Sequence, residues 1–97
     1  MEEARATKKT SSASVTTKGA NIYGMLLGTD GVNDPAITVY DGIDNTGVEI
    51  IPTTTYDASA LGLNGFMGPF KIRAHSGIYI EITCAGTVEV ITFWMPI

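Results

Sequence analysis

The sequence predicts an all-β fold, an antiparallel β-sandwich preceded by an extended N-terminal arm. Ile, Val and Thr together supply 30 of the 97 residues, against only four Leu, and branched side chains fit a pleated sheet better than a helix. Apolar segments alternate with Gly, Pro, Asn and Asp at roughly ten-residue intervals, which is typical of sandwiches and barrels. No segment shows the i, i+3, i+4 apolar spacing of an amphipathic helix.

A chain of 97 residues is expected to form one domain with a small core, because a domain of this size buries only about 60–65% of its unfolded surface. The 44% apolar content excludes a disordered chain, and no apolar run reaches the ~18 residues of a membrane-spanning helix. Cys84 is the only cysteine, so no intrachain disulfide can form. The first 15 residues lack the apolar stretch of a signal peptide. We therefore expect the protein to fold in the cytoplasm of the cell that makes it.

The N-terminal residues 1–18 predict the arm. They are rich in Ser, Thr and Lys, and Val15 is their only large apolar side chain after Met1. Such a segment cannot bury enough surface to offset its ordering entropy, although residues 12–18 have the composition of a short edge strand. We expect the arm to pair with an exposed sheet edge, either of its own domain or, if the arm serves assembly, of a neighbour, and we expect its deletion to leave the domain 19–97 folded.

Six strands are expected after the arm, separated by turn residues. They cover residues 20–28, 36–41, 48–54, 66–74, 77–83 and 87–95. Asp30-Gly31 and Asn33–Pro35 form the first turn, and the sequence GIDNTG forms the second. Pro52 places the third strand at a sheet edge, because proline donates no ladder hydrogen bond. The connections AHSG and CAG are short enough for hairpins, which predicts a meander of the last three strands.

Two of these strands are apolar on both faces. Residues 78–83 alternate in the ordinary way, with three Ile on one face and Tyr, Glu and Thr on the other. In residues 91–95 and 22–27, by contrast, large apolar side chains occur on both faces, which one small core cannot cover. We therefore predict an interface between chains formed by Tyr23, Met25, Leu27, Ile91, Phe93 and Met95.

The net charge of −4 is divided unevenly along the chain. Residues 1–18 carry +2 and residues 19–97 carry −6. The acidic domain argues against a nucleic-acid partner, which requires clustered Lys and Arg. The arm is instead expected to contact a neighbouring protein, through Arg5, Lys8, Lys9 and Val15.

No catalytic residue is predicted. His75 is the only imidazole and lies beside Ser76 in a predicted turn, where the two side chains would not face each other. No G-x-S-x-G motif occurs, and Cys84 has no nearby cation to lower the pKa of its thiol. We interpret the chain as a non-enzyme.

No metal or cofactor is predicted either. One Cys and one His cannot complete a four-ligand zinc site. Asp30 and Asp34 flank one turn and Asp41 and Asp44 another, but neither has the spacing of a calcium loop, and turn chemistry explains both pairs. Phosphate-binding glycine loops are absent, because no helix follows the glycines.

The aromatic residues leave a sugar-binding site open. The four candidates for a stacking platform are Tyr40, Tyr56, Tyr79 and Trp94. The alternative is ordinary packing, in which each ring is half-buried with its polar tip in contact with water or a partner. Exposed coplanar rings would favour the sugar site.

Four segments carry a resemblance to a known group of proteins. They read SVTTKGANIYGMLLGTDGVNDPAITVYDG, GVEIIPTTTYDAS, FKIRAHSGIYIEIT and GTVEVITFWMPI, and with their connections they span residues 13–97. This arrangement resembles small virion proteins of tailed bacteriophages. The resemblance implies a jelly-roll-like sandwich attached to the capsid, neck or tail, and it implies no catalytic residue.

The first functional hypothesis is a virion structural protein, a capsid cement or decoration protein made in the host cytoplasm. Its partners would be other copies of itself, in a homotrimer or another homo-oligomer, and the major capsid or neck and tail proteins, with no nucleic acid and no membrane. A neck or tail connector, or a fibre-attachment protein, is the alternative. A carbohydrate-binding module for host attachment is the third hypothesis.

Overall fold

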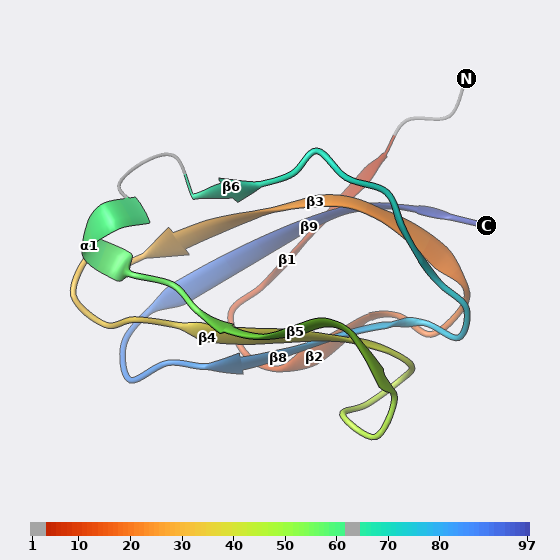
Figure 1. Cartoon of the computed structure of the whole chain (residues 1–97), viewed down its shortest axis with the longest axis horizontal. Coiled ribbons are helices and arrows are strands. Elements are labelled where there is room, and N and C mark those ends of the chain that lie inside the picture. The colour runs from red at the N-terminus through yellow and green to blue at the C-terminus, as the bar shows by residue number, and fades with distance from the viewer. Residues whose placement is uncertain (1–3, 62–64) are drawn as a thin grey trace.

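The chain folds into two antiparallel β-sheets that pack face to face (Figure 1). This computed structural model describes residues 4–61 and 65–97. The strands are β1 (Arg5–Lys9), β2 (Ala13–Thr16), β3 (Ala20–Thr29), β4 (Ala36–Asp41), β5 (Val48–Thr55), β6 (Phe66–Met67), β7 (Ile72–Ala74), β8 (Ile78–Thr83) and β9 (Val88–Pro96). One short helix, α1 (Ala58–Leu61), follows β5. The predicted all-β fold of antiparallel sheets is therefore confirmed.

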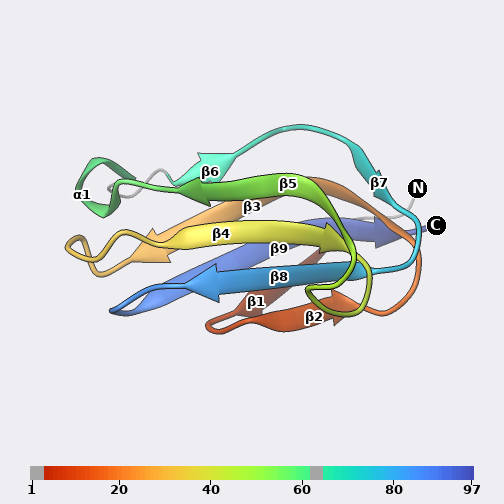
Figure 2. The same ribbon diagram turned by 60° about the horizontal axis from the view of Figure 1, so that its bottom comes forward.

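Each sheet is built around a central pair of strands. One sheet has the order β1-β9-β3-β6, and β7 also pairs with β3; we call it the β3–β9 sheet. The other has the order β2-β8-β4-β5 and is called the β4–β8 sheet. Figure 2 shows the β4–β8 sheet in front of the β3–β9 sheet. All described pairings are antiparallel.

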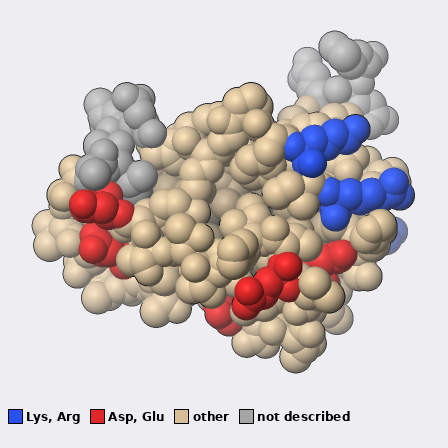
Figure 3. Space-filling view, viewed as in Figure 1, with Lys and Arg blue, Asp and Glu red and all other residues tan. Residues whose placement is uncertain are grey.

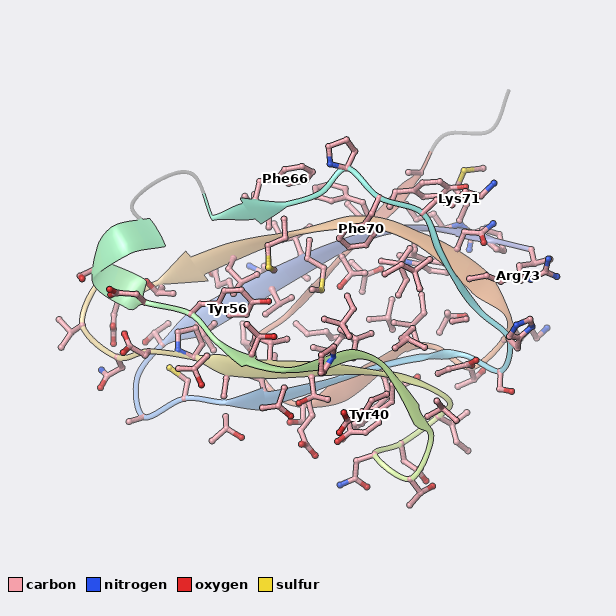
Figure 4. The ribbon with its side chains drawn as sticks, viewed as in Figure 1. Tyr40, Tyr56, Phe66, Phe70, Lys71 and Arg73 are labelled. Atoms are coloured by element: carbon pink, nitrogen blue, oxygen red, sulfur yellow. The ribbon has the colours of Figure 1, made fainter. Side chains whose placement is uncertain are left out.

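The core lies between the two sheets, and both supply its branched side chains. Ile22 and Val90 come from the β3–β9 sheet, and Ile37, Val39 and Ile80 from the β4–β8 sheet, all completely buried. At the β5 and β7 side of the sandwich, two aromatic rings pack against this core (Figure 4): Tyr56 follows β5 and Phe70 precedes β7. In β8 the alternation of apolar and polar residues thus predicts the core face.

The strand expected over 66–74 is interrupted. It consists of β6 and β7, separated by a segment that contains Gly68 and Pro69. Gly68 has a φ of +136°, which is outside the range of ordinary strand residues, and Pro69 has no backbone N–H for the ladder. Both residues break the pairing with β3, so this part of the sheet edge is formed by two short strands.

The short helix α1 was not expected from the sequence. Its first residue, Ala58, donates its backbone N–H to the Asp34 carboxylate at 2.9 Å, from a turn 24 residues earlier in the chain. Asp57 accepts the backbone N–H of Ser59 at 3.0 Å. Carboxylates in these positions satisfy N–H groups that a helix leaves unpaired.

The expected arm differs from what the structure shows in the described part of residues 1–18. β1 pairs with β9, with Arg5 opposite Trp94, and β2 pairs with β8, with Ala13 opposite Ile80. Val15 packs against the core. The segment gains backbone hydrogen bonds at two sheet edges of its own chain, where few apolar side chains are needed. Deletion of residues 1–18 is therefore expected to remove an edge strand from each sheet and to destabilise the fold.

The contacts of β1 explain why this polar strand is ordered. The Trp94 indole Nε1–H donates to Thr7 Oγ1 at 2.9 Å. The Arg5 guanidinium lies 5.1 Å from the centre of the Trp94 ring, a cation–π contact. Lys8 forms an exposed ion pair with Glu89 at 3.6 Å, and such pairs contribute little stability. The cover of Trp94 is thus the main side-chain contribution of β1.

A β-bulge in β3 changes which of its side chains face the core. Ile22 lies opposite Trp94 and Gly24 lies opposite Phe93, so Tyr23 is an extra residue in the ladder. Beyond the bulge the alternation is shifted by one residue. Met25 therefore faces the core on the same side as Ile22, although an unbroken strand would place them on opposite faces.

Thr92 provides a test of the core. Its side chain is completely buried, and its Oγ1 has no hydrogen-bond partner among the described residues. Thr92→Val removes this unpaired hydroxyl and keeps the shape, so the free energy of unfolding should rise by about 1 kcal/mol in urea denaturation. Thr38→Val is the matched control, because the buried Thr38 Oγ1 lies 2.6 Å from Thr53 Oγ1. This control should lose about 1 kcal/mol. A loss of stability in Thr92→Val would contradict the assignment.

Candidate interaction surface

The outer face of the β3–β9 sheet, the side turned away from the core, is apolar at its centre. The ladder places Leu26 between Ile91 on β9 and Phe66 on β6. Phe93 lies next along β9 on the same face. We call this surface the apolar face, and its large members are Tyr23, Leu26, Phe66, Ile91, Phe93 and Met95. Five are half-buried within the chain, and Phe66 is 47% exposed.

Gly24 makes room for the aromatic rings of this face. The Phe66 and Phe93 rings lie 6.2 Å apart, centre to centre, and are tilted by 59°. A Cβ atom at Gly24 would come within 3.0 Å of both Phe66 Cζ and the Met67 carbonyl oxygen. The absent side chain at Gly24 therefore allows the Phe66 ring to lie close to β3.

Charged side chains lie at both ends of the apolar face. At one end, Arg73 on β7 lies opposite Asn21. Lys71 comes two residues before Arg73 in the chain, directly ahead of β7. Figure 4 labels Lys71 and Arg73 at this end, and Figure 3 shows basic side chains there. At the other end lies the Lys8–Glu89 pair, which is neutral as a pair. Among the described residues at these two ends, the excess charge is therefore positive, although the chain as a whole carries −4.

The structure brings four of the six predicted interface residues together on this face: Tyr23, Ile91, Phe93 and Met95. It corrects the other two. Met25 is 1% exposed and Leu27 is 3% exposed, both in the core of the same chain. The cause is the bulge at Tyr23, which reverses the faces of the residues that follow it.

Two members of the apolar face, Leu26 and Phe66, were missed. The same bulge accounts for Leu26, because strict alternation along β3 places this residue with Ile22 on the core side. Phe66 lies between Gly65 and Met67 in a segment whose strands are very short. A lone exposed aromatic residue among glycines is the only signal that the sequence offers for it.

A second cluster lies on the outer face of the β4–β8 sheet. The Tyr40 and Tyr79 rings are 6.2 Å apart at 61°, an edge-to-face pair. Tyr40 OH donates to Glu81 Oε1 at 3.5 Å, and Asn45 Nδ2 donates to Glu81 Oε2 at 3.1 Å. Burial and the negative charge of Glu81 raise the pKa of the Tyr40 hydroxyl. Tyr40, Asn45 and Glu81 thus satisfy one another on this polar face, whereas the buried Ser14 hydroxyl, opposite Tyr79, has no hydrogen-bond partner among the described residues.

The predicted sugar platform is not brought together. Tyr40 is only 9% exposed, and its partner Tyr79 meets it edge-on instead of in one plane. Trp94 belongs to the other sheet and lies beneath Arg5. Tyr56 packs against the core, and burial raises the pKa of its hydroxyl. In the described part of the chain, these four rings therefore form no flat, exposed stack for a sugar.

The aspartates of the turns bind backbone groups of their own chain. Asp30 accepts the N–H groups of Val32 and Asn33 at 2.9 and 2.8 Å. Asp41 accepts those of His75 and Ser76 at 2.9 and 2.7 Å, and so fixes the turn between β7 and β8. In residues 4–61 and 65–97, no group of three or more His, Cys, Asp and Glu side chains could hold a metal ion.

The side chains of His75 and Cys84, the candidate base and the candidate nucleophile, form no hydrogen bond with each other in the described structure. His75 is exposed on its turn, while the half-buried Cys84 thiol donates to the Asn33 carbonyl oxygen at 3.6 Å.

Within the described ranges, no helix is long and apolar enough to cross a membrane. Comparisons of the chain with models of protein families, with curated proteins and with solved structures found no match.

The Asp30 turn predicts a specific response to acid. Hydrogen bonds from Asn33 and Val32 lower the pKa of Asp30 from 3.8 to about 2. The unfolded chain therefore binds this proton more readily, so the contribution of Asp30 is complete above pH 4 and is lost as the pH falls towards 2. Asp30→Asn should flatten the pH dependence of the unfolding free energy in this window, measured by urea denaturation. Parallel curves for the two proteins would contradict this role.

Proposed function

We propose that this protein is a non-enzymatic structural protein of a tailed-phage virion, a capsid cement protein that acts through contacts between subunits. The observation that carries the proposal is the apolar face, which joins the three strands β3, β6 and β9 and whose large side chains are not fully covered by the described residues of the chain. A small domain rarely exposes clustered aromatic and aliphatic side chains to water without a partner. Assembly into a particle would supply that partner.

The order of the strands supports the jelly-roll part of the proposal. When the interrupted β6 and β7 are counted as one strand, eight strands pair in a nested order. The first lies beside the last, the second beside the seventh, the third beside the sixth and the fourth beside the fifth. Jelly rolls of this kind occur in viral capsid domains and in lectins. The geometry of Tyr40 and Tyr79 favours the first use over the second.

The N-terminal segment offers a contact to the particle. β1 and β2 are the edge strands on one side of the two sheets, so each has a row of backbone groups beyond which no described strand of this chain lies. A strand of a capsid protein would extend either sheet by backbone hydrogen bonds. Lys9 stands on β1 beside this edge, and it would favour an acidic partner.

Quantitative mass spectrometry of purified particles tests the location. Hundreds of copies per virion are expected for a cement protein, whereas about six to a few dozen copies would place the protein at the neck or tail. Absence from purified particles would overturn both assignments.

The apolar face itself is tested in solution. The wild-type protein is expected to form a homo-oligomer, a trimer being the expected closed form, in size-exclusion chromatography with light scattering. Phe93→Asp places a charge in a desolvated contact and should raise the dissociation constant at least a hundredfold, or about 2.7 kcal/mol. Val32→Asp changes an apolar side chain that is 80% exposed in a distant turn, and should have no effect. A stable wild-type monomer would overturn the assembly role.

A further inference from the structure

The hairpin between β4 and β5 exposes two apolar side chains that the fold does not explain. Ile43 is 61% exposed and Val48 is 73% exposed. Asp44 and Glu49 stand directly beside them and are exposed as well. We call residues 42–49 the hairpin tip. Apolar side chains next to carboxylates on a projecting turn are suited to a contact with a surface that is both apolar and basic.

The hairpin tip is fixed in position by hydrogen bonds. Asn45 Nδ2 donates to Glu81 on the neighbouring strand, and the Gly42 N–H donates to the Gly77 carbonyl oxygen at 3.2 Å. The Asp44 carboxylate accepts the Thr46 hydroxyl and, at 2.9 Å, the Thr46 backbone N–H, and these two bonds lower the pKa of Asp44. The tip therefore presents Ile43 and Val48 without a large loss of conformational entropy on binding.

The hairpin tip and the apolar face are complementary in composition and in charge. The apolar face has Phe66, Phe93 and neighbouring side chains at its centre, with Lys71 and Arg73 at one end. In Figure 3, basic side chains lie at the upper right, whereas acidic ones form one group at the left, near α1, and another at the lower right. Among the described residues, the hairpin tip therefore carries acidic side chains and the β7 end of the apolar face carries basic ones.

The two surfaces cannot meet within one chain. The hairpin connects strands of the β4–β8 sheet and projects from it, whereas the apolar face is the outer side of the β3–β9 sheet (Figure 1). The core separates them. A contact between them therefore requires a second copy of the chain.

We infer that the hairpin tip of one copy packs on the apolar face of the next copy, which is the contact that builds the homo-oligomer. This inference rests on the proposed assembly function and specifies its partner surface. The contact is heterologous, because each copy gives its tip to one neighbour and its face to another, and three or more copies can close into a ring. A symmetric contact of face with face would instead bring together two surfaces whose excess charge is positive.

The closing experiment mixes two variants that are defective in different surfaces. The tip variant is Ile43→Lys with Val48→Lys, and the face variant is Phe93→Asp. Each alone should be monomeric by light scattering and native mass spectrometry. In an equal mixture, the intact tip of the face variant should bind the intact face of the tip variant, so that a heterodimer appears. Val32→Lys is the matched control for an added cation on an exposed turn and should assemble like the wild type.

A charge exchange tests the same contact without touching its apolar centre. Lys71→Glu with Arg73→Glu should weaken assembly at least tenfold, and addition of Glu49→Lys in the same chain should restore part of it. The restoration should diminish as the salt concentration rises. Asp44 is left unchanged in these variants because its carboxylate holds the turn.

Each outcome decides between the alternatives. If the tip variant assembles like the wild type while Phe93→Asp dissociates, the inference is overturned and the apolar face remains an interface. If both variants are monomeric but no heterodimer forms, the heterologous contact is overturned. A monomeric wild type overturns both the inference and the assembly role. Circular dichroism melting shows whether a variant is folded, and Met95→Asp replaces Phe93→Asp if the latter is not.

Discussion

The pairing of β3 with β9 at the bulge of Tyr23 is the constraint on which the rest of the structure depends. β3 is the longest strand and lies beside β9 along almost its whole length. One extra residue in this ladder moves Met25 and Leu27 into the core and turns Gly24 outward. The bulge therefore has two effects. It adds Met25 and Leu27 to the small core, and it places Gly24 where its missing side chain leaves space for the Phe66 ring. Core packing and the apolar face have a single geometric cause.

The N-terminal strands complete this arrangement at the opposite edge of the sheets. Trp94 is a large core residue near the edge of its sheet, and its indole N–H needs a hydrogen-bond partner when buried. β1 supplies Thr7 for this bond and Arg5 for the face of the ring. Ser12 holds the start of β2, because its hydroxyl accepts the Ile82 N–H at 2.8 Å. This segment, whose only large apolar side chain in the described part is Val15, is thus ordered mainly by its hydrogen bonds and by its contacts with Trp94.

The sequence predicts the strands well where periodicity is local, and less well where distant residues decide. Alternation and turn residues place β3, β4, β5, β8 and β9 within one or two residues of their observed bounds. The bulge leaves no mark in the pattern, because a bulge is a property of two paired strands. The N-terminal pairing is equally hidden, since a chain of Ser, Thr and Lys becomes a strand only when an edge is available. The sequence pattern therefore places the residues of β9 and Tyr23 on the outer face, where the structure has them, but not the residues beyond the bulge, and their role in an interface stays a prediction.

The distribution of polarity over the two outer faces limits how copies can associate. The β4–β8 sheet presents a polar face in which Tyr40, Glu81 and Asn45 satisfy one another, so it gains little from burial. The apolar face gains most, and the exposed apolar side chains of the hairpin tip gain as well. A contact between tip and face buries both sets at once, but a heterologous contact that does not close would propagate into a filament. The hydrogen bonds that fix Asn45 and Gly42 set the angle of the tip to the body, and this angle determines whether successive copies return to the first.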